Sequence, residues 1–101
     1  MPNATTTIVY PKGCKFDMDY YLKTHMPLVA DNWTQFGLKS WKVIKMGEDS
    51  PYSVQATIEW GSIDEFQKAA SSDTVSKVMG DVPNFTDGSP TVMSGDVVGS
   101  S

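Results

Sequence analysis

Residues 52–60 alternate strictly between apolar and polar side chains. Tyr52, Val54, Ala56, Ile58 and Trp60 share one face, and the four residues between them are all polar. Because successive side chains of a strand point to opposite faces, this pattern predicts a strand with one buried face. A chain of 101 residues has room for one layered domain, with roughly 65% of its surface buried on folding. We therefore expect a single domain over residues 1–101, with an ordered core over residues 4–98.

The segments around this strand carry the signals of a small α+β domain. Asp17 is a plausible N-cap for a helix that Gly37 ends. Ser62 and Glu65 form a capping box that opens a second helix, with Phe66, Ala69 and Ala70 facing inward. The predicted order is strand, helix, strand, strand, helix with a short helical continuation, and strand: residues 5–10, 17–36, 38–46, 52–60, 62–70, 73–79 and 91–98. This β-α-β-β-α-β order predicts the ferredoxin-like arrangement.

The charge inventory excludes whole classes of partner. The net charge is −4 and all eight basic residues are Lys, so we expect no nucleic acid and no membrane surface as partner. No apolar run reaches the length of a membrane span. Cys14 is the single cysteine, and the first residues lack the pattern of a secretory signal, which favours the cytoplasm. The expected ligand is a small, largely apolar organic molecule.

The first predicted helix carries the chemistry. At 100° per residue, one apolar stripe collects Met18, Tyr21, His25, Leu28, Val29, Asn32 and Phe36. His25 is the only histidine of the chain and lies near the middle of this stripe. Tyr21 precedes it by four residues and Asn32 follows it by seven, so a hydroxyl, an imidazole and an amide share one row.

Two roles for His25 fit this pattern. A buried histidine is often a structural residue bonded to a backbone carbonyl, but its pKa also suits a general acid or base in a cavity. Asp19 and Asp31 point away from it, so the apolar surroundings are expected to lower its pKa unless a carboxylate partners it. Pro27 is expected to bend the helix beside it, which either opens space under the sheet or is ordinary curvature.

Residues 20–29, with the sequence YYLKTHMPLV, resemble the EthD-like domain of the dimeric α+β barrel superfamily. Similar runs are Tyr10-Pro11, Phe16-Asp17, Gly37-Leu38 and Asp81-Val82-Pro83-Asn84-Phe85. The resemblance implies a ferredoxin-like subunit that forms a homodimer through its sheet, with a pocket between sheet and helices that His25 lines. Members of this superfamily include isomerases, cofactor-free monooxygenases, polyketide cyclases, decarboxylases and some haem enzymes.

Other candidate groups are weaker. Cys14 lies between Lys12 and Lys15, but without a nearby base or second thiol an ordinary loop thiol is favoured over a reactive one. One histidine and one cysteine give no recognised metal-ligand spacing, so no metal is expected. Haem needs a single axial histidine and stays an alternative. Phe85, in the loop over residues 81–90, is expected to cover a pocket mouth.

Together with the resemblance to the EthD-like domain, these patterns predict a homodimeric enzyme without a cofactor, acting in catabolism or secondary metabolism. His25 would transfer a proton on an aromatic or polyketide-type substrate, in an isomerisation, cyclisation, decarboxylation or monooxygenation. Tyr21 or Asn32 would bind the developing enolate oxygen. The expected substrate pocket consists of Tyr21, Leu28, Val29, Asn32 and Phe85. A non-catalytic binding or accessory protein is the alternative, and haem-dependent oxidation is a further one.

Overall fold

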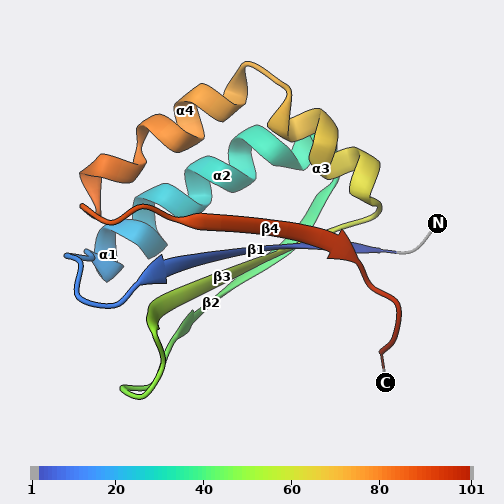
Figure 1. Cartoon of the computed structure of the whole chain (residues 1–101). Coiled ribbons are helices and arrows are strands. Elements are labelled where there is room, and N and C mark those ends of the chain that lie inside the picture. Colours follow the sequence, from blue (N-terminus) through green and yellow to red (C-terminus); the bar gives the residue numbers. More distant parts are fainter. Residues whose placement is uncertain (1–2, 101) are drawn as a thin grey trace.

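Four antiparallel strands form one sheet in the order β2-β3-β1-β4. The computed structural model describes residues 3–100. Its strands are β1 (Ala4–Pro11), β2 (Leu38–Lys45), β3 (Tyr52–Trp60) and β4 (Thr91–Asp96). All helices lie on one face of the sheet (Figure 1). The ferredoxin-like α+β fold predicted from the order of the elements is therefore confirmed.

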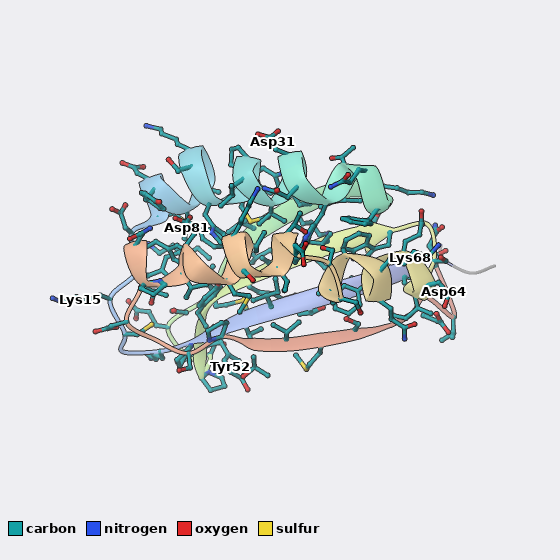
Figure 2. The ribbon with its side chains drawn as sticks, turned by 90° about the horizontal axis from the view of Figure 1, so that it is seen from above. Lys15, Asp31, Tyr52, Asp64, Lys68 and Asp81 are labelled. Carbon is teal, nitrogen blue, oxygen red and sulfur yellow. The ribbon has the colours of Figure 1, made fainter. Side chains whose placement is uncertain are left out.

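The helical layer has two arms. The first arm is one continuous helical stretch made of α1 (Met18–Tyr20), η1 (Tyr21–His25), α2 (Met26–Trp33) and η2 (Thr34–Phe36). The second comprises α3 (Ile63–Ala70), α4 (Thr74–Gly80) and η3 (Val82–Asn84). Viewed from above, α4 lies between α2 and β4 (Figure 2). In the described part of the chain, every helix is too short or too polar to cross a membrane.

Strand register divides the sheet into a covered face and an open face. Val54, Ala56, Ile58 and Trp60 of β3 point toward the helices and are at most 3% exposed, as their alternation predicts. Antiparallel pairing brings partnered residues to the same face. Trp41 and Val43 of β2 therefore lie on the covered face, because they pair with Ile58 and Ala56. The alternate residues of β3, Ser53, Gln55, Thr57 and Glu59, lie on the open face. Tyr52, predicted on the buried face, is 40% exposed because it lies at the start of the strand.

The capping residues predicted for the first helical arm are confirmed, whereas those predicted for the second arm are wrong in part. Asp17 accepts a hydrogen bond from the Tyr20 backbone N–H at 3.1 Å, and Gly37 ends the first arm with φ +118°. Ser62 precedes α3 as expected, but its side chain makes no capping hydrogen bond. The Glu65 carboxylate lies against Gly37 instead, where a Cβ atom would collide with it. The capping-box prediction is therefore wrong in its hydrogen bonds.

Candidate active site

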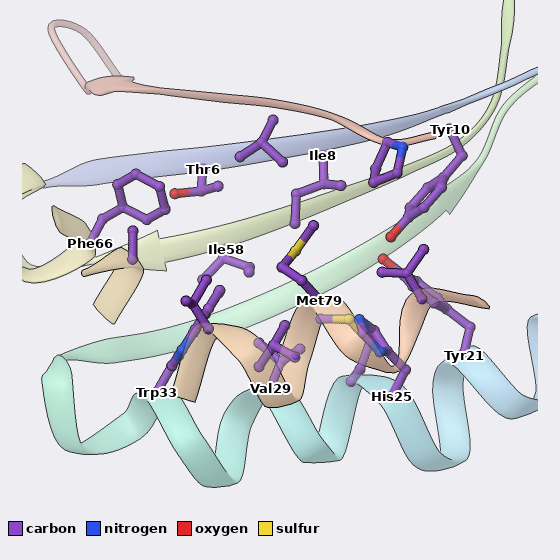
Figure 3. Close-up of a pocket in the computed structure, with 17 residues that line it drawn as sticks. Thr6, Ile8, Tyr10, Tyr21, His25, Val29, Trp33, Ile58, Phe66 and Met79 are labelled. Carbon is purple, nitrogen blue, oxygen red and sulfur yellow. The ribbon is translucent and has the colours of Figure 1, made fainter. Parts of the chain in front are cut away.

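A cavity of about 240 Å³ lies between the covered face of the sheet and both helical arms (Figure 3). Aliphatic and aromatic side chains make up most of its wall. The polar groups are Thr6 and Tyr10 from β1 and Tyr21 and His25 from η1. Met79 and Val92, from α4 and β4, also line the cavity and are 43% and 46% exposed. The cavity therefore opens to solvent between α4 and β4.

His25 owes its position to a π-helical turn. In η1 the backbone N–H of Met26 donates to the carbonyl of Tyr21, five residues earlier, rather than four. Pro27 follows at the start of α2, where it has no N–H to continue the ladder. Wide π turns of this kind insert one residue into an α-helix and occur often at functional sites. The turn places Tyr21 and His25 against the cavity, with both side chains buried.

Asp81 is the hydrogen-bond partner of His25. Its Oδ2 lies 3.0 Å from Nδ1 of the imidazole, across the gap between the first arm and the end of α4. A carboxylate can only accept hydrogen bonds, so Nδ1 carries the proton and donates it. Nε2 is then the atom of the neutral ring with a free lone pair. This is the tautomer in which the ring can accept a proton from a ligand.

Two further donors hold the Asp81 carboxylate. The Tyr20 hydroxyl donates to Oδ1 at 2.6 Å, and the Asn84 amide donates to the same oxygen at 2.8 Å. Burial acts to raise the pKa of Asp81, but the hydrogen bonds from Tyr20, Asn84 and His25 outweigh it and bring that pKa below its ordinary value. Asp81 is therefore a fixed negative charge near neutral pH.

Burial dominates the electrostatics of His25. The residue is 4% exposed, and its desolvation lowers the pKa of the imidazole below the ordinary value, while Asp81 opposes the shift. Two aromatic rings flank the imidazole. The Tyr21 ring stacks on it at 5.3 Å, and the Phe85 ring lies at 4.6 Å. His25 is thus neutral at pH 7, with a carboxylate beside it to stabilise any charge it gains.

Two tyrosine hydroxyls meet at the same end of the cavity. The hydroxyls of Tyr10 and Tyr21 point toward each other there (Figure 3). Burial raises the pKa of Tyr10 to about 12. Burial and, secondarily, the neighbouring Tyr10 raise the pKa of Tyr21 further still. Both groups are therefore protonated donors at neutral pH. The Tyr10 hydroxyl is close enough to influence the Tyr21 hydroxyl, but no described residue makes a hydrogen bond of regular geometry to it.

The structure separates the residues expected to form the pocket. Tyr21, His25 and Val29 line the cavity, whereas Leu28, Asn32 and Phe85 do not. The π turn shifts the phase of the helix by part of a turn, so Met26 and Trp33 take the inward positions that a regular helix gives to Leu28 and Asn32. The Asn32 amide bonds the Leu28 carbonyl within its own helix. Phe85 is 3% exposed and packs behind the imidazole instead of covering a mouth.

Sequence reasoning did not identify Asp81, Tyr20 or Tyr10 as site residues. Asp81 lies 56 positions from His25, on another helical arm, so no helical periodicity connects them. One signal was available: Asp81 begins the run Asp81-Val82-Pro83-Asn84-Phe85 that resembles the EthD-like domain. Tyr10 stands at the end of β1, and only the strand register places it on the cavity side.

No protein-family model matches the sequence, and no curated protein matches it either. Solved structures do match in fold. An EthD-like protein of Ralstonia eutropha has a TM-score of 0.84 and 24% identity, with 97% of this chain and 94% of that chain covered. A dimeric ferredoxin-like protein from an uncultured marine organism has a TM-score of 0.69 and 16% identity over 100% of both chains. SnoaB, a cofactor-independent oxygenase of Streptomyces nogalater, has a TM-score of 0.63 and 10% identity, covering 99% of this chain and 97% of that chain.

These likenesses establish the fold and leave the reaction open, since every identity is below 25%. The chain has the ferredoxin-like fold of EthD-like proteins, as the resemblance of residues 20–29 implies. Its neighbours in fold include proteins described as dimeric and a cofactor-independent oxygenase.

Proposed function

We propose that the protein is an enzyme that uses His25 to move a proton on an apolar organic substrate, without a bound cofactor. The observation that carries this proposal is the hydrogen bond of 3.0 Å between His25 and Asp81 at the wall of an apolar cavity. A structural histidine would need one backbone acceptor at most. A carboxylate held by three donors fixes the tautomer and orientation of the ring, as a general base requires.

The shared chemical step is a proton transfer. Nε2 of the neutral imidazole accepts the proton of a C–H next to a carbonyl, or of a phenol O–H. The electron pair of the broken bond stays on the substrate as an enolate or phenolate, and the Asp81 carboxylate stabilises the imidazolium that forms. The largely apolar wall of the cavity strengthens these interactions. Return of the proton to another atom completes an isomerisation or cyclisation.

The same step also begins a cofactor-free oxygenation, in which the carbanion reacts with O₂. SnoaB, which shares the fold, is a cofactor-independent oxygenase, and this supports oxidoreductase chemistry as one form of the proposal. Isomerase and cyclase reactions begin at a comparable carbanion. A decarboxylation forms its carbanion by loss of CO₂, and there the imidazolium form of His25 would deliver the proton to that carbon. We propose the cytoplasm as the location of the reaction.

A non-catalytic carrier needs the cavity but has no use for an oriented imidazole, so the His25–Asp81 pair favours an enzyme. Haem-dependent oxidation fits poorly, because a cavity of about 240 Å³ is below the roughly 300–1,000 Å³ of drug-sized ligand sites. A porphyrin is larger than most such ligands.

The test begins with mass spectrometry of small molecules that co-purify with the native protein. The identified compound is then incubated with the protein in D₂O, and incorporation of deuterium at carbon or formation of product is followed. We expect the His25→Gln variant to keep its fold and to lose roughly 10²- to 10⁴-fold in rate. Asp49→Asn, in the exposed turn between β2 and β3, is the control. Turnover unchanged in His25→Gln contradicts a catalytic role, and binding without turnover in the native protein indicates a carrier.

We also propose a homodimer formed through the open face of the sheet. Ile44 and Met93 lie on this face, since they pair with Gln55 and Thr7, and they are 40% and 50% exposed. Apolar side chains on both faces of β2 favour a sheet that is covered twice. Light scattering should give twice the 11.1 kDa of one chain. Ile44→Glu should reduce that mass to a single chain, and a native protein that is already monomeric at micromolar concentration contradicts the proposal.

A further inference from the structure

The Tyr21 hydroxyl is the one buried hydrogen-bonding group of the cavity wall that lacks a partner among the described residues. Tyr21 is 0% exposed, and Tyr10, whose hydroxyl faces it (Figure 3), is 2% exposed. Thr6, at the other end of the cavity, is already occupied: its hydroxyl accepts from the Trp60 indole at 3.0 Å and bonds Ser94 at 3.2 Å. The hydrogen-bonding group left free for a ligand atom is therefore at the tyrosine end of the cavity.

An unpaired buried hydroxyl is unfavourable, so its presence needs a reason. Both tyrosines keep their protons at neutral pH, because burial raises their pKa values. They are therefore donors, and the group that would satisfy Tyr21 is an acceptor such as a carbonyl, enolate or phenol oxygen. The residues that line this wall carry no charge at pH 7, because the imidazole of His25 is neutral there.

The tyrosine pair and the base share one wall. The rings of Tyr21 and His25 stack at 5.3 Å with an interplanar angle of 14°. A ligand oxygen bound by the Tyr21 hydroxyl therefore lies near the imidazole, and neighbouring atoms of the same ligand lie within reach of the His25 side chain. Apart from Thr6, whose hydroxyl is already hydrogen bonded, the rest of the wall up to the mouth between Met79 and Val92 is apolar.

The volume limits the size of the ligand. A cavity of about 150 Å³ accommodates benzene, so about 240 Å³ accommodates one ring or two fused rings. Larger polycycles would have to extend through the mouth.

We propose that the hydroxyls of Tyr10 and Tyr21 bind the oxygen of a one- or two-ring aromatic ligand, a phenol or an aryl ketone, with the oxygen at the tyrosine end and the rings toward α4 and β4. The proposal deepens the proposed function by naming the substrate class of that same cavity. It concerns binding alone and stands without any statement about turnover.

The test compares 1-naphthol with naphthalene by isothermal titration calorimetry on the native protein and on variants. One hydrogen bond to a buried donor should favour 1-naphthol by roughly three- to tenfold in Kd. Tyr21→Phe should remove this preference and leave naphthalene binding unchanged. Tyr52→Phe, on the exposed start of β3, is the matched control and should keep the preference. 1-Hydroxypyrene, with four rings, should bind at least tenfold more weakly than 1-naphthol.

Three results of the binding measurements overturn the proposal. A native protein that binds both probes equally has no oxygen site. A preference that survives Tyr21→Phe but disappears in His25→Gln assigns the oxygen to the imidazole. 1-Hydroxypyrene that binds as well as 1-naphthol removes the size limit.

The melting temperature shows whether the Tyr21→Phe variant is folded. Tyr21→Phe should melt at or above the temperature of the native protein, because it deletes an unpaired hydroxyl. A lower melting temperature means that Tyr10 already satisfies the group, which contradicts the proposal. The proposed proton transfer fails separately, if His25→Gln retains turnover while the tyrosine preference holds.

Discussion

The two faces of the sheet use the same strands for different purposes. On the covered face, β3 presents Ala56, Ile58 and Trp60, all 0% exposed, and space remains above them for a cavity. On the open face, the same strand presents Ser53, Gln55 and Thr57, which are only half-buried. The covered face thus combines packing with a cavity, while the open face carries polar side chains that are partly accessible to solvent. One alternating strand serves both because its side-chain period is two.

The largest expected difference between the faces is in the free energy of unfolding. Trp60 is fully buried, and its indole donates to Thr6. Trp60→Ala should therefore reduce the free energy of unfolding by about 3–5 kcal/mol. Lys42→Ala on the open face should change it by less than about 0.5 kcal/mol. Urea denaturation measures both, in the Ile44→Glu background so that dimerisation does not contribute. Equal losses at the two positions would remove the distinction between the faces.

We expect pH to have an intermediate effect on the free energy of unfolding, because the covered face contains a buried imidazole. The folded pKa of His25 is below the ordinary 6.5, so between these two values the unfolded chain binds more protons than the folded one. The free energy of unfolding is therefore constant above pH 6.5 and falls as the pH drops toward the folded pKa. His25→Gln should abolish this fall, measured by urea unfolding at successive pH values. A slope that persists in the variant assigns the effect to other groups.

Protonation of Asp81 should cause a second loss of stability as the pH falls, at a lower pH than the loss caused by His25. Its folded pKa is below the ordinary 3.8, so its contribution to stability is complete above that value and is lost as the pH falls through the folded pKa. Asp81→Asn should reduce the acid phase. Because Asp81 also opposes the lowering of the His25 pKa, the stabilities of Asp81→Asn and the native protein should run parallel only above pH 6.5. Asp49→Asn serves as the control for removing one carboxylate.

The smallest expected effect lies on the open face. The Thr57 hydroxyl is buried without a hydrogen-bond partner among the described residues, and Thr57 pairs with Thr7 and Lys42 at the centre of that face. Thr57→Val should raise the free energy of unfolding by up to about 1 kcal/mol, because it removes an unpaired polar atom at nearly constant volume. Thr7→Val is the matched control and should change it less. A loss of stability in Thr57→Val would show that the hydroxyl is satisfied.

The sequence predicted the elements better than the contacts between them. β3 begins and ends as its alternation predicts, and Asp17 and Gly37 bound the first helical arm because capping is a local property of the chain. β4 ends at Asp96 rather than at residue 98. These features follow from residues close together in sequence, for which pattern and propensity are sufficient.

The site was less predictable for two physical reasons. The π turn before Pro27 changes the helical phase, so an arc drawn at 100° per residue selects Leu28 and Asn32 where Met26 and Trp33 face the cavity. The partner of His25 comes from the packing of α4 on the first arm, which no single-element pattern contains. Tyr21, His25 and Val29 were nevertheless placed on the inner face correctly, because they lie within one turn of the bulge.

The separation of 56 positions between His25 and Asp81 also determines when the site forms during folding. A contact of this range closes a long loop, and its entropic cost is met only when α4 docks beside the first arm. A nascent chain that ends before residue 81 contains the histidine but lacks its orienting carboxylate. The imidazole therefore gains its hydrogen-bond partner late, after the second half of the domain is made, and the tautomer of His25 reports whether the two helical arms have assembled.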